Sequence, residues 1–464
     1  MRGAAARELS DAGAHAAAVL WSRVNVGDML EGLMTPLALS FVRHYRDHVH
    51  GDCLAAVGMR DRGRPELYYR AFEGRVYANV SYFGFLFSQT PIGSDLRAFL
   101  RGFTDESVDL ARYRSPYGRY GAGSVPIASW WYWVTTQARQ ARTPSRRVEQ
   151  LAGRARLEGA RFRSLVLSSL SVSELGVELE RALAGFRSAY AGYMPFYFTA
   201  YLLQGASAEL ARRWLAPGDA EPFARAAAAA MSVGGERRRL LAGLARAARQ
   251  AGVDRVIART DPREIEAALS GDPAGRAFLR QVVDPFLREH GVRGRREMEL
   301  MNPRWIDAPA LLHEELQGCV QQGGDDRAGA EVSAAPIAPL AGLARHRRVA
   351  LAALAAAARR WAGYRLAARP GVLAAIWFVR SLALELGRRL AQIGALRGAD
   401  EVAFLELDEI RAFAAGRPSG RPVTRTTLDA RRRAHRAHPR DREPPAILSG
   451  SAPARFSRSD VVRS

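Results

Sequence analysis

The sequence of 464 residues contains no lysine, so all 68 of its basic residues are arginine. A lysine that forms a Schiff base, acts as a general base or holds a P-loop phosphate is therefore excluded. Arginine stays protonated and binds carboxylate or phosphate with paired N–H donors, but it cannot accept a proton. Because total replacement of lysine by arginine suggests coding bias, part of the basic charge says little about function.

Cysteine is also scarce, with only Cys53 and Cys319. Two cysteines cannot build a disulfide framework, so we expect a cytoplasmic protein. Acidic residues interrupt the N-terminal segment, and a signal peptide is not predicted. The most apolar later segment, residues 370–386, carries Arg380 at its middle and is too short for a membrane span. We predict a core helix there and no association with membranes.

The composition favours a helical fold. Hydrophobic residues make up 48% and charged residues 25%, an ordinary globular balance, and alanine and leucine favour helix. Two runs, PELYYRAF and RVYANVSYF, flank the turn residues Glu73 and Gly74 and are rich in aromatic and β-branched residues. Such runs predict a β-hairpin. The expected fold is mainly α, a multi-helix domain with a small β-hairpin near the N-terminus.

The pattern along the chain predicts five segments. We expect a leader helix over 1–20, a mostly helical body over 21–320, a polar Gly-rich linker over 321–339 and closing helices over 340–415. Within the last of these, DEVAFLELDEIRAF is typical of a short strand or extended run that enters a final helix. A basic tail, predicted to be disordered, follows over 416–464.

The net charge of +21 is uneven, because the tail has 12 arginines against 4 acidic residues, or +8. Such charge attracts nucleic acid or other anions. Since charge alone supports it, we do not expect nucleic-acid binding to be the function.

Candidate sites from residue pattern alone are few. His44 and His48 share a helix face, and Asp47, His50 or Cys53 could complete a metal site. The spacing matches no established ligand set, and surface histidines at a helix end explain it equally well, so we predict no metal.

Two aromatic runs, Trp130–Trp133 and Met194–Tyr201, are consistent either with a pocket for a greasy ligand or with core packing. The Gly-rich GRYGAGS segment matches no phosphate-binding motif and predicts a turn. The residue patterns offer no complete catalytic set.

Four blocks in sequence order resemble the central domain of the phosphoenolpyruvate synthase and rifampicin phosphotransferase family. The first reads W-x-R-x-N-x-G and then T-P-L-x-x-S, and the second G-R-x-Y-x-N. The third reads G-x-R-G-x-x-E followed by P-R-W, and the last pairs closing helices with a double proline. The matching residues are Trp21, Arg23, Asn25, Gly27, Thr35, Pro36, Leu37, Ser40, Arg75, Tyr77, Asn79, Gly291, Arg293, Gly294, Glu297, Pro303, Arg304, Trp305, Arg365, Arg380, Pro444 and Pro445.

The chain also departs from the family pattern. Val292 and Leu366 stand where the family has histidine and glutamate, and Asp28 and Arg295 replace glutamate and proline. Valine and leucine cannot transfer protons, so these departures weaken a catalytic interpretation.

The resemblance implies an acceptor-binding module of a split or degenerate phosphotransferase. In the family, an ATP-grasp domain precedes these blocks and a phosphohistidine domain follows them, and we expect both in trans. We expect ATP and magnesium on a partner, no cofactor on this chain and a small hydrophobic acceptor. The catalytic candidates are Arg293 and Glu297, and the substrate-binding candidates are Trp21, Arg23, Asn25, Thr35, Arg365 and Arg380.

Other interpretations stay open. The arginines and glutamates could form a structural ion-pair network instead. A non-catalytic binding protein for a hydrophobic small molecule is the alternative function, and a truncated gene product is a further possibility.

Overall fold

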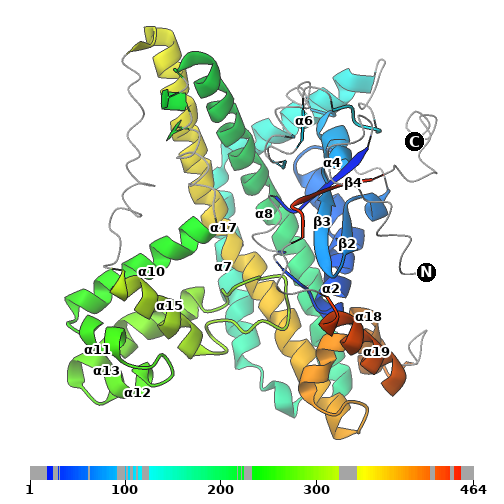
Figure 1. Ribbon diagram of the computed structural model, residues 1–464, viewed down its shortest axis with the longest axis vertical. Coiled ribbons are helices and arrows are strands. Elements are labelled where there is room, and N and C mark those ends of the chain that lie inside the picture. Colours follow the sequence, from blue (N-terminus) through cyan, green and yellow to red (C-terminus); the bar gives the residue numbers. More distant parts are fainter. Residues whose placement is uncertain are drawn as a thin grey trace. The chain divides into compact units, whose positions relative to one another are not determined.

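The structure is a computed structural model. It describes residues 18–24, 30, 32–60, 63–90, 100, 103–104, 108–110, 113–117, 125–216, 218–220, 222–223, 233–322, 342–417, 424–438 and 444–450. Its chain divides into two compact units (Figure 1). Unit 1 holds the described residues up to 195, with 296–301 and those from 378 onward, and unit 2 holds 196–295 and 302–377. Two of the boundaries fall inside long helices, α8 (Val172–Trp214) and α17 (Arg345–Gln392), and the other two enclose residues 296–301.

Unit 1 combines helices with one small sheet, as predicted for the fold class. Its helical elements, besides the parts of α8 and α17, are α2 (Pro36–His48), α3 (His50–Ala56), η1 (Pro65–Leu67), α4 (Val80–Phe87), α6 (Val125–Arg142), α7 (Pro144–Ser164), η3 (Leu167–Ser169), η6 (Ala399–Phe404), α18 (Leu407–Ala414) and α19 (Arg425–Arg436). Aromatic side chains of α2 and α8 form part of its core; Phe41 and Phe186 lie 4.9 Å apart between ring centroids.

The sheet of unit 1 is antiparallel, with strand order β2-β3-β1-β4. The predicted hairpin is confirmed as β2 (Tyr69–Phe72) and β3 (Arg75–Asn79), joined through Glu73 and Gly74, which both have positive φ. The second predicted run ends as a strand at Asn79, because the Asn79 side chain accepts a hydrogen bond from Tyr82 N and caps α4.

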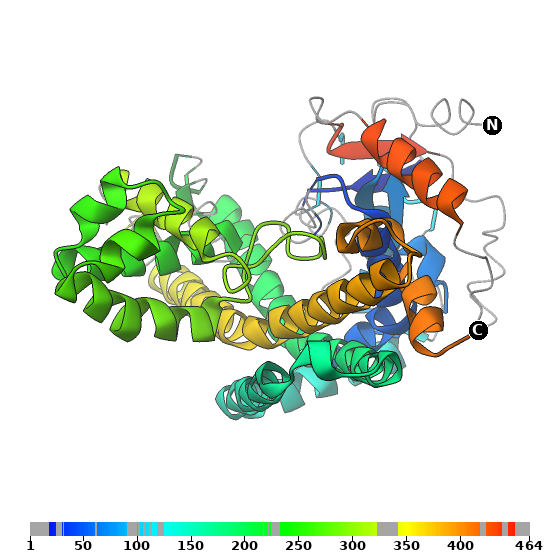
Figure 2. The ribbon, with the colours of Figure 1, turned by 90° about the horizontal axis from the view of Figure 1, so that it is seen from below.

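The two remaining strands come from opposite ends of the chain. In β1 (Val19–Ser22), Trp21 pairs with Asn79 on one side and with Leu448 of β4 (Ile447–Gly450) on the other. Figure 2 shows β4, in red, beside the blue strands. Residues 1–17 of the expected leader lie outside the described residues, and its last residues belong to β1.

The prediction of disorder is wrong for two segments of the tail, α19 and β4. Helix α19 starts at the Thr424 cap, buries Leu428 and pairs its arginines with carboxylates of η6 and α18. The prediction from composition considered only the charges within the tail. It could not include the carboxylates of η6 and α18 that pair with them. In DEVAFLELDEIRAF the predicted helix is confirmed as α18, which a Glu406–Glu409 capping box begins, but the residues before it form the 3-10 helix η6 instead of a strand or extended run.

Unit 2 consists of helices around its own core (Figure 2). Buried residues such as Leu244, Ile257 and Trp305 form that core, and a smaller cluster joins Ala211 and Phe223 to Leu351. Besides parts of α8 and α17, its elements are α10 (Val233–Gln250), α11 (Asp254–Arg259), α12 (Ile265–Ser270), α13 (Pro273–Phe278), the π-helix η4 (Leu279–Val283), α14 (Asp284–His290) and α15 (Pro309–Gln321). Most of the predicted linker, from residue 323 on, lies outside the described residues.

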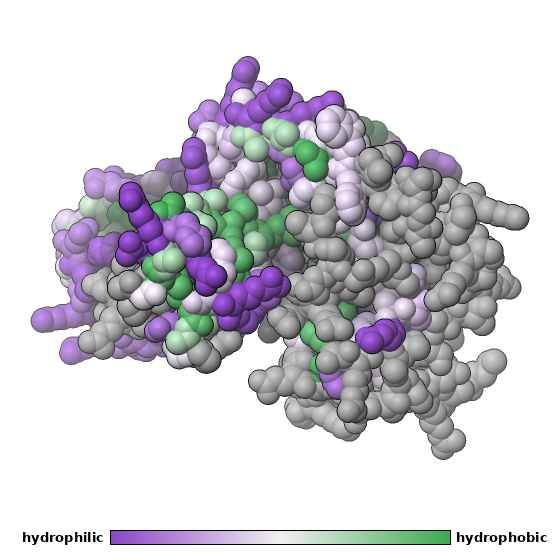
Figure 3. Space-filling view, turned by 90° about the horizontal axis from the view of Figure 1, so that it is seen from above, coloured by the Kyte–Doolittle hydropathy of each residue, from purple (hydrophilic) through white to green (hydrophobic). Residues whose placement is uncertain are grey.

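Both hydrophilic and hydrophobic side chains reach the surface. Figure 3 shows one face, where hydrophilic side chains project at the left and at the top and hydrophobic ones lie between them. One described helix, α17, is long and apolar enough to cross a membrane, but 72% of its most apolar stretch is buried inside the fold.

A buried hydroxyl links β1 to α4 and yields a stability prediction. Ser81 Oγ accepts a 2.7 Å hydrogen bond from Leu20 N and lies 2.6 Å from the Tyr113 hydroxyl. Ser81→Ala leaves the buried Leu20 N–H without this acceptor, so we expect a loss of about 1–3 kcal/mol in the free energy of unfolding, measured by chemical denaturation. Ser169→Ala, which removes an exposed hydroxyl, is the control; equal losses for both variants would contradict the prediction.

Candidate functional site

A carboxylate shared by two arginines lies inside unit 2. Glu236 of α10 accepts from Arg293 Nη2 at 2.6 Å through one oxygen and from Arg369 Nη1 of α17 at 3.0 Å through the other. Arg293 follows α14. The three side chains therefore join three segments that are distant in sequence, and we call them the Glu236 cluster.

The Glu236 cluster is buried: Glu236 is 6% exposed, Arg293 5% and Arg369 2%. Burial alone would raise the pKa of the Glu236 carboxyl, but Arg293 and then Arg369 hold that pKa below its usual value. Glu236 is consequently ionised at neutral pH. The buried charged side chains described in unit 2 are four arginines and this one carboxylate, so cations predominate.

A turn with two glycines positions Arg293. Trp305 N donates to the Arg293 carbonyl at 3.0 Å, and Ile306 N donates to the Gly291 carbonyl at 2.8 Å. A Cβ at Gly291 would lie 2.3 Å from the Leu287 carbonyl oxygen, and one at Gly294 would lie 3.0 Å from the Pro303 carbonyl oxygen. These close approaches give a physical reason for glycine at both matched positions.

Arg365 lies one helical turn before Arg369 on α17. Its guanidinium is over the Tyr197 ring, 5.3 Å from the centroid. Aromatic side chains of the Met194–Tyr201 run and of α17 meet in the same unit; Phe196 lies 6.0 Å from Trp361 between ring centroids. The buried Phe196 belongs to the core, whereas Trp361 and Tyr197 are only half-buried.

Sequence reasoning found two members of this region and missed two. Arg293 and Arg365 were candidates, but Glu236 and Arg369 were not. Arg369 carried a usable signal, since it follows Arg365 by four residues and must share its helix face. The sequence signal for Glu236 was weaker: it is the acidic residue directly before three consecutive arginines.

The Thr35 candidate serves a different contact, in unit 1. Glu299 accepts from Thr35 N at 2.8 Å and from Thr35 Oγ1 at 2.9 Å, across 264 positions of sequence. Thr35 also caps α2, by accepting from Ala38 N. Glu297 is buried in the same unit. Glu299 therefore anchors the start of α2.

Two of the remaining candidates, Trp21 and Arg23, lie at the sheet of unit 1. Trp21 packs edge-on against Phe72, and Arg23 donates to the Pro444 carbonyl at 3.3 Å. The Tyr77 hydroxyl donates to the Pro445 carbonyl at 2.8 Å, so the first block and the double proline meet at the β1–β4 pair. Arg380 is buried within α17. Asn25 lies outside the described residues.

The histidines that the sequence offered as possible metal ligands lie in two different environments. The His44 and His48 rings lie 4.9 Å apart, whereas His50 is buried and its Nδ1 lies 3.1 Å from the Tyr45 hydroxyl. Within the described residues, no group of three His, Cys, Asp or Glu side chains could hold a metal ion.

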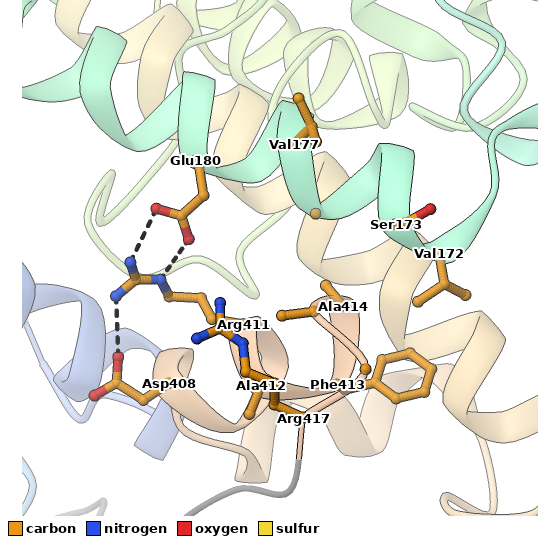
Figure 4. A pocket seen from close by; sticks show the side chains of 13 residues that line it. Val172, Ser173, Val177, Glu180, Asp408, Arg411, Ala412, Phe413, Ala414 and Arg417 are labelled. Carbon is orange, nitrogen blue, oxygen red and sulfur yellow. Dashed lines mark hydrogen bonds and ion pairs between the residues drawn. The ribbon is translucent and has the colours of Figure 1, made fainter.

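An open cavity of about 1060 Å³ lies in unit 1 between the start of α8 and the end of α18. Its lining is mostly small and apolar, with Arg411 held by Glu180 and Asp408 at one end (Figure 4). None of the predicted site residues lines it. The cavity and the Glu236 cluster are therefore two different candidate sites.

The chain was compared with known proteins. Residues 192–365 match the family described as rifampicin phosphotransferase fourth domain. The chain contains a central domain of the phosphoenolpyruvate-utilising type. The resemblance stated from the sequence is thereby confirmed, and the matched segment includes Glu236, Arg293 and Arg365.

Two relatives show how far the similarity extends. The chain is 30% identical over 451 residues to the prodigiosin synthesizing transferase PigC of Serratia marcescens, with 93% of this chain and 50% of PigC covered. It is 32% identical over 161 residues to an uncharacterized protein of Mycobacterium tuberculosis, with 35% of this chain and 16% of that protein covered. The chain thus spans half of the length of PigC and less of the mycobacterial protein.

The burial of the Glu236 cluster predicts a large cost for losing the carboxylate. Glu236→Ala leaves two guanidiniums buried without it, so we expect the free energy of unfolding to fall by about 3–5 kcal/mol. Glu209 of α8 is the matched control, because it also pairs with two arginines, Arg212 and Arg213, at the surface. Glu209→Ala is expected to cost at most about 1 kcal/mol. Chemical denaturation measures both; similar losses would show that burial does not set the cost.

His44 predicts a pH effect on stability. Burial first, then His48 and Arg411, lowers the pKa of His44 to about 4, from 6.5 in the unfolded chain. Because the folded pKa is the lower one, the neutral ring stabilises the fold above about pH 6.5, and this contribution is lost as the pH falls towards 4. His44→Gln should flatten the fall in melting temperature over that range. The exposed His346→Gln is the control, and an unchanged pH profile in His44→Gln would refute the prediction.

Proposed function

We propose that this chain is the acceptor-binding module of a phosphotransferase of the rifampicin phosphotransferase and phosphoenolpyruvate synthase type. It would act with ATP-grasp and phosphohistidine domains supplied in trans, in the cytoplasm. ATP and magnesium would bind to those partners, and this chain would need no cofactor of its own.

The Glu236 cluster carries the proposal. Phosphoryl transfer requires fixed cations around the transferring group, and a low-dielectric site makes each of them more effective. Glu236 holds Arg293 and Arg369 in place, so little reorganisation is needed. Among the described residues, the Arg293 side chain makes its one hydrogen bond to Glu236, and 5% of its surface stays exposed. Arg293 is thus the member of the cluster that a phosphate would reach, with Arg365 as a second cation.

The proton acceptor is assigned to a carboxylate, because arginine cannot serve and lysine is absent. The sequence candidate for this role is Glu297, a buried carboxylate of unit 1. The half-buried aromatic rings near Arg365 would form an apolar wall for a small hydrophobic acceptor.

The alternative function is a binding protein for a hydrophobic small molecule, without chemistry. Val292 and Leu366 favour it, since neither can transfer a proton at positions where the family has histidine and glutamate. The aromatic wall would serve this function equally well.

A phosphate-transfer assay tests the proposal. The chain is incubated with ATP and candidate acceptors, an ansamycin and pyruvate, alone and with separately purified ATP-grasp and phosphohistidine domains of a relative. We expect transfer only in the mixture. Arg293→Gln removes a cation from the transition state and should lower the rate about 10²–10³-fold.

Arg433→Gln, at an exposed position of α19, is the control and should leave the rate unchanged. Thermal unfolding of each variant separates lost chemistry from lost folding. No transfer in any mixture, with ligand binding still detected by calorimetry, would favour the binding protein; transfer unaffected by Arg293→Gln would remove the cluster from the reaction.

A further inference from the structure

Helix α6 carries the aromatic run Trp130–Trp133, which the sequence assigned either to a pocket or to core packing. Three of its side chains are instead exposed. Trp131 is 70% exposed, Trp130 41% and Tyr132 38%, and Val134 is exposed beside them. Trp131, Val134, Ala138 and Arg142 recur at three- and four-residue spacing and therefore share one face of the helix. Large aromatic side chains on an outer face mark a binding surface more often than a structural need.

The opposite face of α6 is fixed to the rest of unit 1. Gln137 donates to the Val57 carbonyl at 2.9 Å, and Gln140 donates to the Ala56 carbonyl. Trp133 Cα lies 3.0 Å from the position that a Cβ at Gly58 would take. The exposed aromatic rings are consequently held on a rigid support.

Helix α6 and the helix that follows it, α7, carry a strongly positive charge. Helices α6 and α7 together, residues 125–164, contain eight arginines and two glutamates, a net charge of +6. One of the glutamates, Glu158, pairs with Arg161. Among the described residues, Arg142, Arg146 and Arg154 have no hydrogen-bond or ion-pair partner. An occupant of this surface must therefore be anionic.

We propose that the exposed face of α6, with the arginines of α6 and α7, binds the surface of an anionic lipid bilayer. Tryptophan and tyrosine prefer the headgroup region, and arginines next to them are attracted to anionic lipids. Exposed aliphatic side chains decide against single-stranded nucleic acid, because Val134 and Leu157 of α7 cannot stack on bases but do gain from entering an acyl boundary. This revises the expectation, made from the sequence, of no association with membranes, and it does not depend on the proposed function.

Sedimentation of the full chain with vesicles tests the proposal. One set of vesicles contains phosphatidylcholine alone and the other equal amounts of phosphatidylcholine and phosphatidylglycerol. We expect binding to the second set only, weakening as salt is added. The double variant Trp130→Ser/Trp131→Ser should weaken binding at least tenfold, and Arg142→Gln about fivefold.

Two control variants test whether the binding of vesicles depends on α6. Ile393→Ser removes a side chain that is 68% exposed elsewhere in unit 1, and Arg433→Gln removes an exposed arginine of α19; both should bind vesicles like the unchanged chain. Because Trp130 and Trp131 are exposed, the double variant should keep its thermal unfolding. No binding to anionic vesicles, equal loss in the controls, or retained binding in the double variant would overturn the proposal, as would displacement of the bound vesicles by single-stranded RNA.

Discussion

The hydrogen bonds of Glu236 join three segments of unit 2 that are distant in sequence. Folding buries two guanidinium groups and one carboxylate together. Burying any one of these charged groups alone would cost much free energy. Because the partners come from α10, the turn after α14 and α17, the cluster requires these three segments to be in register before its charges are satisfied. The glycine turn, the position of Trp305 and the one-turn spacing of Arg365 and Arg369 all serve that requirement.

The sequence predicted those features whose signals are local. The hairpin could be found because alternation and a turn lie within one short segment, and the helical body because apolar spacing repeats along it. The family blocks identified Arg293, Thr35 and Arg365 by type and order. Spacing between neighbours is enough for such inferences.

Features that depend on distant partners could not be predicted. β4 is a strand because β1 pairs with it, more than 400 positions away, and α19 is ordered because η6 and α18 supply carboxylates to its arginines. The partnership of Glu299 with Thr35, 264 positions apart, was equally hidden. The Glu236 cluster was predicted only in part for the same reason: Arg293 matched a motif, and Arg369 and Glu236 did not.

Arginine has opposite roles in the two parts of this protein, and the net charge of +21 does not distinguish them. Arg293 and Arg369 are buried, fixed by a shared carboxylate and positioned within 3.0 Å of it, so they suit a ligand that must be held in one geometry. Arg142, Arg146 and Arg154 are exposed on α6 and α7 and suit a fluid surface that imposes no geometry. A chain without lysine must use one residue type for both purposes, and the burial of each arginine, rather than the total charge, determines which purpose it serves.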